Sequence, residues 1–357
     1  MNAPQRPRLN SLDQFRGYTV AGMFLVNFLG GFAAIHPLLK HHNTYCSYAD
    51  TIMPQFFFAV GFALRLAFLR HVEKAGAAQA YRQAIVRGFG LILVGAVIYH
   101  LDGKFSSWEA LSREGLGGFV STAWRRSMFQ ALVHIGVTSL WVLPVIARSA
   151  RVQILWLAGS AALHIWLSAS WWHDWLRANR VIDGGPLGFL TWTIPILAGS
   201  LTYMYLERNG REKSYRPFLV TAVLIMAAGY TLSCLSNGGV LAAPPFVPPW
   251  HGRDMWTMSQ QAGSASYLVF ATGFSLAVYT FFLWWSDARD RQWSVFRALG
   301  VNALAGYVLH MLVDDAVKPF APKDSPLAWA LVAFLIFFSI TWLFLRSLER
   351  NKIFIRL

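Results

Sequence analysis

Long apolar segments alternate with short polar connections along the 357 residues of this chain. A segment of about 17 to 25 apolar residues is long enough to cross a bilayer as a helix. Ten such segments lie near residues 17–36, 51–69, 84–100, 127–147, 152–170, 188–206, 217–235, 264–285, 298–316 and 326–346. The pattern predicts an all-α, polytopic membrane protein with about ten transmembrane helices in one integral-membrane domain, residues 1–357.

The composition points the same way. Hydrophobic residues make up 55% of the chain and charged residues 13%, whereas soluble domains carry about 25% charged residues. The first sixteen residues are too polar, and the apolar run after them is too long, for a removable signal peptide. We therefore expect the first helix to remain as a membrane anchor.

The net charge of +14 comes from Lys and Arg residues that lie in the short connections rather than on one patch. This distribution argues against nucleic acid as a partner and favours the lipid bilayer. With the amino terminus in the cytoplasm, about two thirds of the 31 basic residues fall on the cytoplasmic side, in agreement with the positive-inside rule. Both termini are therefore expected in the cytoplasm.

The two cysteines, Cys46 and Cys234, are too few for a zinc site or a disulfide framework. We therefore expect no bound metal. A single bridge between these cysteines stays open on the sequence alone.

The first helix carries polar residues that apolar segments normally exclude. Ser11 and Gln14 have the spacing of a capping box, which predicts a helix start near Leu12. Asp13 and Arg16 then lie one turn apart at the beginning of this helix. Polar groups at membrane depth are costly, so such residues are candidates for a function.

Arg16 and Asn27 are eleven residues apart, which in a helix is about three turns, or about 16 Å along one face. The spacing predicts a guanidinium near the membrane surface and an amide deep inside. A guanidinium suits the phosphates of a coenzyme, and an amide can donate a hydrogen bond to a developing oxyanion.

Histidines gather in the connection after the first helix. His36, His41 and His42 precede Asp50, which is predicted to cap the second helix. Histidine titrates near neutral pH, and a carboxylate partner can orient it as a base or a nucleophile. His41, His42 and Asp50 are therefore candidate catalytic residues.

The order of short motifs from Arg8 to Gly61 resembles a known family. The motifs are Ser-Leu-Asp, Phe-Arg-Gly, Val-Asn, Lys-His and Ala-Asp, followed by a proline and phenylalanines. They resemble the transmembrane acetyltransferases typified by heparan-alpha-glucosaminide N-acetyltransferase and its bacterial relatives. Further similarity lies in the Asp-Gly-Gly string before residue 188, in Trp256, Thr257 and Ser259, in Asn302 and His310, and in the terminal string KIFIRL. More distantly, Arg16 and Asn27 resemble the arginine and histidine signature of membrane O-acyltransferases, with Asn27 in place of histidine.

This resemblance implies a homodimeric enzyme of a bacterial-type cytoplasmic (inner) membrane. The enzyme would transfer an acetyl group from cytoplasmic acetyl-CoA to an amine or hydroxyl of an extracytoplasmic sugar. The expected catalytic residues are His41 as base or acyl carrier, Asn27 and Asp50, with His42 as the alternative to His41. Acetyl-CoA is expected at Arg16, Asp13, Asn302 and His310, and the acceptor at Trp256 and Ser259.

Two departures from the family pattern leave questions open. The spacing from His41 to Asp50 is one residue shorter than in the family, so the choice between His41 and His42 stays open. Asn43, Thr44 and Tyr45 stand where the family has a tryptophan, so the acceptor can differ from glucosamine.

The connection 236–260 is rich in proline and glycine, which predicts an irregular loop able to act as a lid. Within it, Arg253 and His251 suit an anionic or hydroxylated substrate. Segment 298–316 is predicted as one helix in which Ala303, Tyr307, His310 and Asp314 share a face. A purely structural hydrogen-bond network between helices is the other interpretation of that face.

A transporter or flippase for an anionic or glycan-linked substrate is the main alternative, because buried His, Asp and Arg can relay protons or bind anions. The sequence shows no evident internal repeat and no matching Gly or Pro breaks of the kind that inverted-repeat transporters carry. A non-catalytic scaffold is a third interpretation, and it leaves the charged first helix unexplained.

Overall fold

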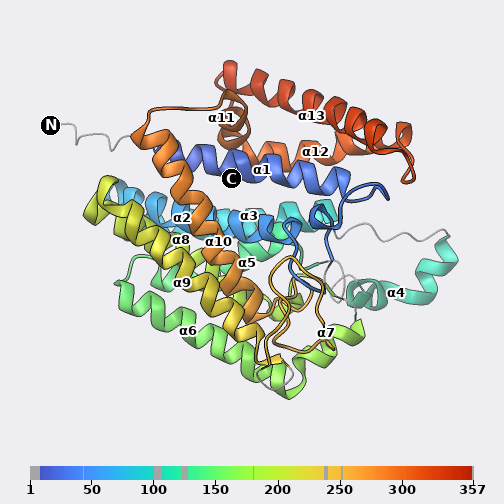
Figure 1. Cartoon of the computed structure of the whole chain (residues 1–357), viewed down its shortest axis with the longest axis horizontal. Helices are drawn as coiled ribbons and strands as arrows, with labels where there is room; N and C mark the ends of the chain where they lie inside the picture. Colours follow the sequence, from blue (N-terminus) through green and yellow to red (C-terminus); the bar gives the residue numbers. More distant parts are fainter. Residues whose placement is uncertain are drawn as a thin grey trace. The chain divides into compact units, whose positions relative to one another are not determined.

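The computed structural model describes residues 9–42, 44–99, 107–122, 128–179, 181–236, 240–250 and 252–355. Every regular element within these ranges is a helix, which confirms the predicted all-α class for them (Figure 1). The α-helices are α1 (Asn10–Leu29), α2 (Ile52–Ala75), α3 (Ala77–Tyr99), α4 (Trp108–Thr122), α5 (Ala131–Val142), α6 (Ala150–Leu167), α7 (His173–Asn179), α8 (Phe189–Asn209), α9 (Tyr215–Ser233), α10 (Ala265–Phe282), α11 (Ser294–Val301), α12 (Ala303–Val317) and α13 (Leu327–Arg350).

Among the described residues, seven helical stretches are long and apolar enough to cross a membrane. They are Ala49–Ala75, Ala77–Ile98, Ala150–Asn179, Gly185–Asn209, Glu212–Ser233, Ala265–Ala288 and Leu327–Arg350. A bent pair, α11 with α12, makes up to eight. The predicted number of ten is therefore not supported: neither α1 nor the shorter apolar stretch Ala131–Val145 is one of the seven.

The predicted single helix over residues 298–316 is wrong. The chain bends by 96° between Ser294–Val301 and Ala303–Phe320, and Asn302 at the break has φ −120° and ψ 40°. Its amide Nδ2 donates to the carbonyl oxygen of Ile353, and its Oδ1 accepts from the N–H of Ile355. Asn302 thus satisfies the backbone of a distant segment. The four residues predicted to share a face, Ala303, Tyr307, His310 and Asp314, all follow the bend and lie in α12.

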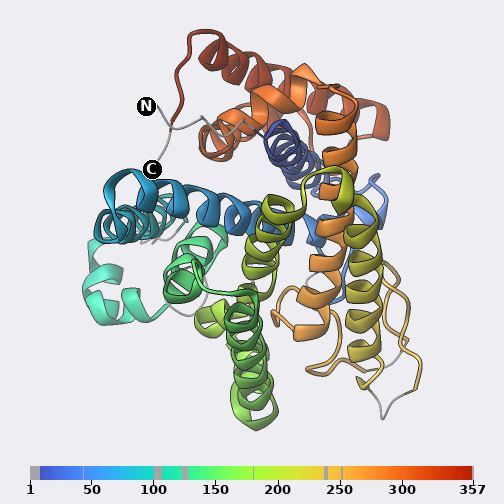
Figure 2. The ribbon, with the colours of Figure 1, turned by 90° about the vertical axis from the view of Figure 1, so that its left-hand side faces the viewer.

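The chain divides into two compact units. The first comprises Met1–Lys40, Asn209–Val220 and Leu276–Arg356, and the second comprises His41–Arg208 and Thr221–Ser275. In the first unit α1 packs against α11, α12 and α13, and both views show α12 and α13 beside α1 (Figures 1 and 2). A Cβ on Gly17 would lie 1.7 Å from the carbonyl oxygen of Phe296, so this crossing requires a glycine.

The predicted capping box at Ser11 and Gln14 is also wrong. α1 begins at Asn10, and its cap residue makes no side-chain hydrogen bond. Ser11 Oγ donates instead to Asp287 Oδ2. Gln14 Nε2 donates to the carbonyl oxygen of Trp293 at 3.1 Å, and Gln14 Oε1 accepts from the Trp293 N–H at 3.0 Å. Both side chains thus bind partners that are distant in the sequence, and they connect α1 to the segment after α10.

In the second unit, α2 and α8 run parallel and cross at two glycines. A Cβ on Gly61 would lie 1.8 Å from the carbonyl oxygen of Ile196, and a Cβ on Gly199 would lie 2.0 Å from that of Phe58. Nearer the amino ends, the rings of Phe57 and Trp192 stack with centroids 4.4 Å apart. This crossing brings the residues before α2 and the residues before α8 to the same end of the unit.

We expect Gly199→Ala to destabilise the protein, because its Cβ has no room unless α2 and α8 move apart. Overpacking typically costs about 1–3 kcal/mol, which should appear as a lower Tm in detergent. Gly159→Ala in α6 is the matched control, because a Cβ there meets no atom within 4 Å. Equal Tm values for the two variants would contradict the tight crossing.

Candidate active site

The centre of the candidate site is a histidine paired with a buried carboxylate. His41 Nδ1 lies 2.9 Å from Asp50 Oδ1. The Asp50 side chain has no exposed surface, whereas the His41 side chain is 36% exposed. Because the carboxylate accepts from Nδ1, Nε2 is the basic nitrogen of the neutral ring. The geometry thus presents an oriented imidazole that substrates can reach.

Asp50 is held by the residues just before it. Its Oδ2 accepts from the Ser47 N–H at 2.8 Å and from Ser47 Oγ at 3.0 Å. The Asp50 N–H in turn donates to Ser47 Oγ at 3.4 Å. This reciprocal pattern is a capping box with the acid three residues after the serine. The prediction that Asp50 is the cap of α2 is therefore wrong: Thr51 holds that position, and Asp50 keeps Oδ1 for His41.

Asp50 is also tied to α10. Tyr267 Oη donates to the Asp50 carbonyl oxygen at 2.6 Å, and the Tyr267 ring lies edge-on to Trp192 at 6.2 Å. The start of α10 thus contacts the Asp50 backbone through Tyr267, and the start of α8 contacts Tyr267 through Trp192.

A second acid and an amide complete the buried part of the site, and sequence reasoning selected neither as a site residue. Gln260 Nε2 donates to Asp183 Oδ1 at 2.8 Å, and Asp183 is 3% exposed. Trp192 Nε1 donates to the Asp183 carbonyl oxygen at 2.8 Å. The available signal was the string Asp183-Gly184-Gly185, because two glycines after an acid before an apolar helix mark a turn.

The pKa values of His41 and Asp183 depend on the charges and hydrogen bonds around them. Burial lowers the pKa of His41, but the hydrogen bond and the charge of Asp50 outweigh it, with added contributions from Asp183 and Gln260. The pKa of His41 therefore lies above its ordinary 6.5. Burial raises the pKa of Asp183 to about 6, helped by the charge of Asp50 and opposed by Gln260 and His41. The protonation of each group therefore depends on the charge of the other.

His42 has a different environment. Its ring stacks on Tyr45 with centroids 4.4 Å apart, whereas the hydrogen bond to Asp50 Oδ1 comes from His41. Of the two histidines left open by the sequence, His41 has the geometry of an oriented base.

The residues expected to bind acetyl-CoA all lie in the first unit. Asp13 and Arg16 are half-buried on α1, and Asn27 is exposed two residues before the helix ends at Leu29. The apolar pattern predicted a segment over residues 17–36, whereas α1 ends at Leu29; the depth of Asn27 in the membrane stays a prediction.

Asn302 and His310 have structural partners. The Asn302 amide binds the segment at Ile353 and Ile355 through both of its ends. His310 Nδ1 lies 2.6 Å from the Tyr307 carbonyl oxygen, and its ring stacks on Phe24 at 5.4 Å. These contacts have the character of the structural network considered above, and a role of the two residues in donor binding stays a prediction.

The residues expected to bind the acceptor lie in the connection before α10, except that His251 falls outside the described residues. Asp254 Oδ1 accepts from the N–H groups of Trp256 and Thr257 and fixes their turn. Arg253 and Ser259 line a pocket with Thr44, Arg177 and His173 among others. The structure therefore brings Arg253 and Ser259 to one cavity with the loop that follows His42.

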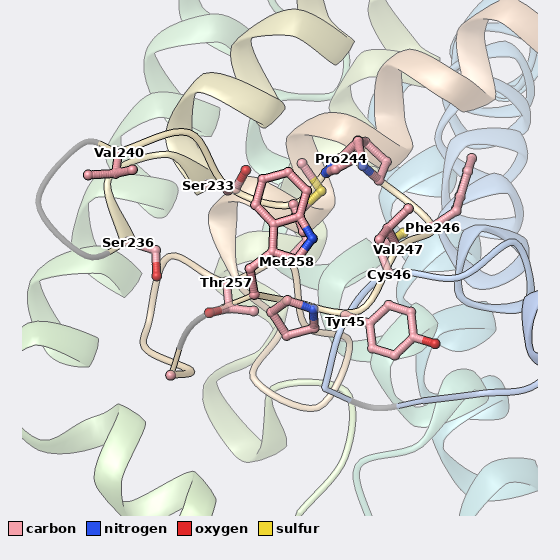
Figure 3. Close-up of a pocket in the computed structure, with 16 residues that line it drawn as sticks. Tyr45, Cys46, Ser233, Ser236, Val240, Pro244, Phe246, Val247, Thr257 and Met258 are labelled. Carbon is pink, nitrogen blue, oxygen red and sulfur yellow. The ribbon is translucent and has the colours of Figure 1, made fainter.

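The predicted lid forms a second pocket (Figure 3). Its described lining includes Tyr45, Cys46, Phe246, Trp250 and Met258, with prolines and small residues, and none of it is charged. The Phe246 N–H donates to the Cys46 carbonyl oxygen at 3.0 Å, which anchors this loop to the chain between His41 and Asp50. Cys46 and Cys234 are both free.

The described residues contain no group of three or more His, Cys, Asp or Glu side chains placed to hold a metal ion. Comparison with known proteins gives no further assignment: no protein-family model matches this chain, and no curated protein matches it either.

Proposed function

We propose that this protein is a membrane acyltransferase. It moves an acetyl group from cytoplasmic acetyl-CoA to an amine or hydroxyl of a sugar on the outer side of a bacterial-type inner membrane. The observation that carries the proposal is the His41–Asp50 pair, in which a buried carboxylate orients an imidazole with one exposed edge. The donor and the acceptor class come from the resemblance of residues 8–61 to the transmembrane acetyltransferases.

The chemistry assigned to the pair is proton transfer. Neutral His41 takes the proton of the attacking amine or hydroxyl at Nε2, while Asp50 stabilises the imidazolium through Nδ1. The acceptor atom bonds to the acetyl carbon, the carbon–sulfur bond breaks with its electron pair on sulfur, and His41 returns the proton to that sulfur. In the other order, His41 Nε2 attacks the acetyl carbon first, and the carbon–sulfur bond breaks with its electron pair on sulfur. The acceptor then attacks the acetyl-imidazole, the carbon–nitrogen bond breaks with its electron pair on Nε2, and the acceptor's proton passes to the thiolate.

The remaining assignments follow from the same proposal. Arg16 and Asp13 serve the donor phosphates, with Asn302 and His310 as further donor contacts, and Asn27 donates to the acyl oxygen. Both termini lie in the cytoplasm of a chain that crosses the membrane ten times, and the enzyme is a homodimer. Arg253, Trp256, Ser259 and His251 meet the acceptor.

A transporter or flippase is the second candidate, because the same buried group supports it. His41 and Asp183 are titratable side chains whose charges shift each other's pKa, and the charge of Asp50 acts on both, as in proton relays. Release of free thiol from acetyl-CoA by the purified protein, with a panel of amino sugars, separates the two functions. An acyltransferase releases thiol in proportion to acetylated acceptor, and a transporter releases none.

We expect His41→Ala to lower the acetyl-transfer rate by at least about 10²-fold, since removal of a general base typically costs about 10² to 10⁴. The variant should still bind acetyl-CoA. In the wild type the rate should rise with pH through the raised pKa of His41, because only the neutral ring accepts a proton. His42→Ala is the matched control and should keep most activity; the opposite order of the two variants would move the role to His42.

Arg16→Ala should weaken acetyl-CoA binding about 10-fold or more, because a hydrogen bond to a charged group contributes about 1.5–3 kcal/mol. Acceptor binding should change far less. Calorimetric titration of each ligand measures both. Asp13→Ala is the control for a structural ion pair at the helix end, which predicts equal losses of expression in the two variants. An unchanged donor affinity in well-folded Arg16→Ala would remove this residue from the donor site.

The proposed orientation predicts the labelling of single cysteines in a variant that lacks Cys46 and Cys234. A cysteine at Ala77, in the connection between α2 and α3, should react only with a reagent that enters the cytoplasm. A cysteine at Val240, which is 59% exposed, should react with an impermeant reagent added outside. Labelling of both positions from one side would contradict this topology.

A further inference from the structure

Two connections interlock beside the His41–Asp50 pair. Asp183, Gly184 and Gly185 have φ values of 56°, 79° and 58°, and Gly263 in the facing turn has φ 56°. A Cβ on Gly263 would lie 2.9 Å from the Gly184 Cα. The Gly184 N–H donates to the Gln261 carbonyl oxygen at 3.0 Å. The turns touch backbone to backbone, and a side chain at either glycine would separate them.

The conformation of Asp183 is unusual because residues other than glycine rarely have positive φ, and holding one there costs free energy. The surrounding bonds keep it in place: Trp192 Nε1 binds its carbonyl oxygen, and Gln260 Nε2 binds its carboxylate. Such strain gathers at functional sites. What this turn achieves is to fix the direction of the Gln260 amide.

The Gln260 amide has a nitrogen end and an oxygen end, and the bond to Asp183 uses the nitrogen. Because Gln260 Nε2 donates to Asp183, Oε1 is the atom available to a donor, and it is buried without a hydrogen-bond partner among the described residues. A buried acceptor without a donor lowers the stability of the fold. His41 is the neighbouring group whose protonated form Gln260 favours, and an imidazolium has a second N–H to give once Asp50 has taken the first.

We infer that Asp183 and Gln260 form a second positioning arm for His41: Asp183 fixes the Gln260 amide, and Oε1 accepts from the imidazolium. The ring is then held from two sides, by Asp50 at Nδ1 and by Gln260 at Nε2. When His41 loses its proton, the second bond is lost and Nε2 becomes free for the acceptor. The consequence for catalysis rests on the proposed function, whereas the arm itself does not.

The test is a pH titration of His41 by NMR in the full chain, labelled in histidine, in lipid nanodiscs and without acetyl-CoA. The His41 signal is assigned by its loss in His41→Gln. Asp183→Asn removes the charge and keeps a residue type that tolerates positive φ, and Gln260→Met removes the amide at similar size. Each change should move the His41 midpoint to lower pH by about half a pH unit or more, because charged and hydrogen-bonded partners favour the protonated ring.

The double variant decides between an arm and two independent effects. Residues in one hydrogen-bond network are not additive, so the combined shift should be smaller than the sum of the single shifts. Asp174→Asn, which removes an exposed carboxylate, should leave the midpoint unchanged. Unchanged midpoints in both single variants, or shifts that add in full, would overturn the inference. If Asp183→Asn does not fold, an unchanged midpoint in Gln260→Met overturns it alone. A normal shift without any thiol release would refute the proposed function and leave the arm standing.

Discussion

The structure of the second unit depends on keeping one carboxylate, that of Asp50, away from water. An ionised carboxylate is costly to bury unless hydrogen bonds replace its hydration. Asp50 has such bonds from Ser47 and His41, and Tyr267 binds its carbonyl oxygen. These partners come from the connection before α2 and from α10, so satisfying this single group places the chain around it. The exposed edge of His41 is the one part of the arrangement that remains open to a ligand.

The crossing of α2 and α8 helps to position Asp50 and Asp183, although it lies away from them along the helices. α2 and α8 meet at Gly61 and Gly199 with no space for a methyl group, and their parallel course carries Asp50 and Asp183 to the same end. In a membrane, helices gain little from the hydrophobic effect among themselves, and close packing at small residues is a main source of their association. The position of two acids is therefore set by glycines about three helical turns away.

The sequence allowed the helical class and the positions of the seven membrane-length helices to be predicted, because apolar length depends on local composition. It also brought His41 and Asp50 forward, since they are near neighbours in the chain. The failures share a cause. Ser11, Gln14 and Asn302 each have a side chain that suits a local cap or a helix face, but each binds a segment more than 50 positions away. Asp183 and Gln260 are 77 positions apart, and nothing local in either stretch indicates the other.

The two hydrogen bonds of the site, His41–Asp50 and Asp183–Gln260, close chain loops of very different length, so we expect them to form at different stages of folding. The His41–Asp50 hydrogen bond closes a loop of 9 positions and the Asp183–Gln260 bond a loop of 77. The entropy lost on closing a flexible loop grows with the logarithm of its length, and contacts between distant residues form slowly. During synthesis His41 can bind Asp50 before α8 has been made. The bond between Asp183 and Gln260 can form only after α9 and the connection that follows it have been made.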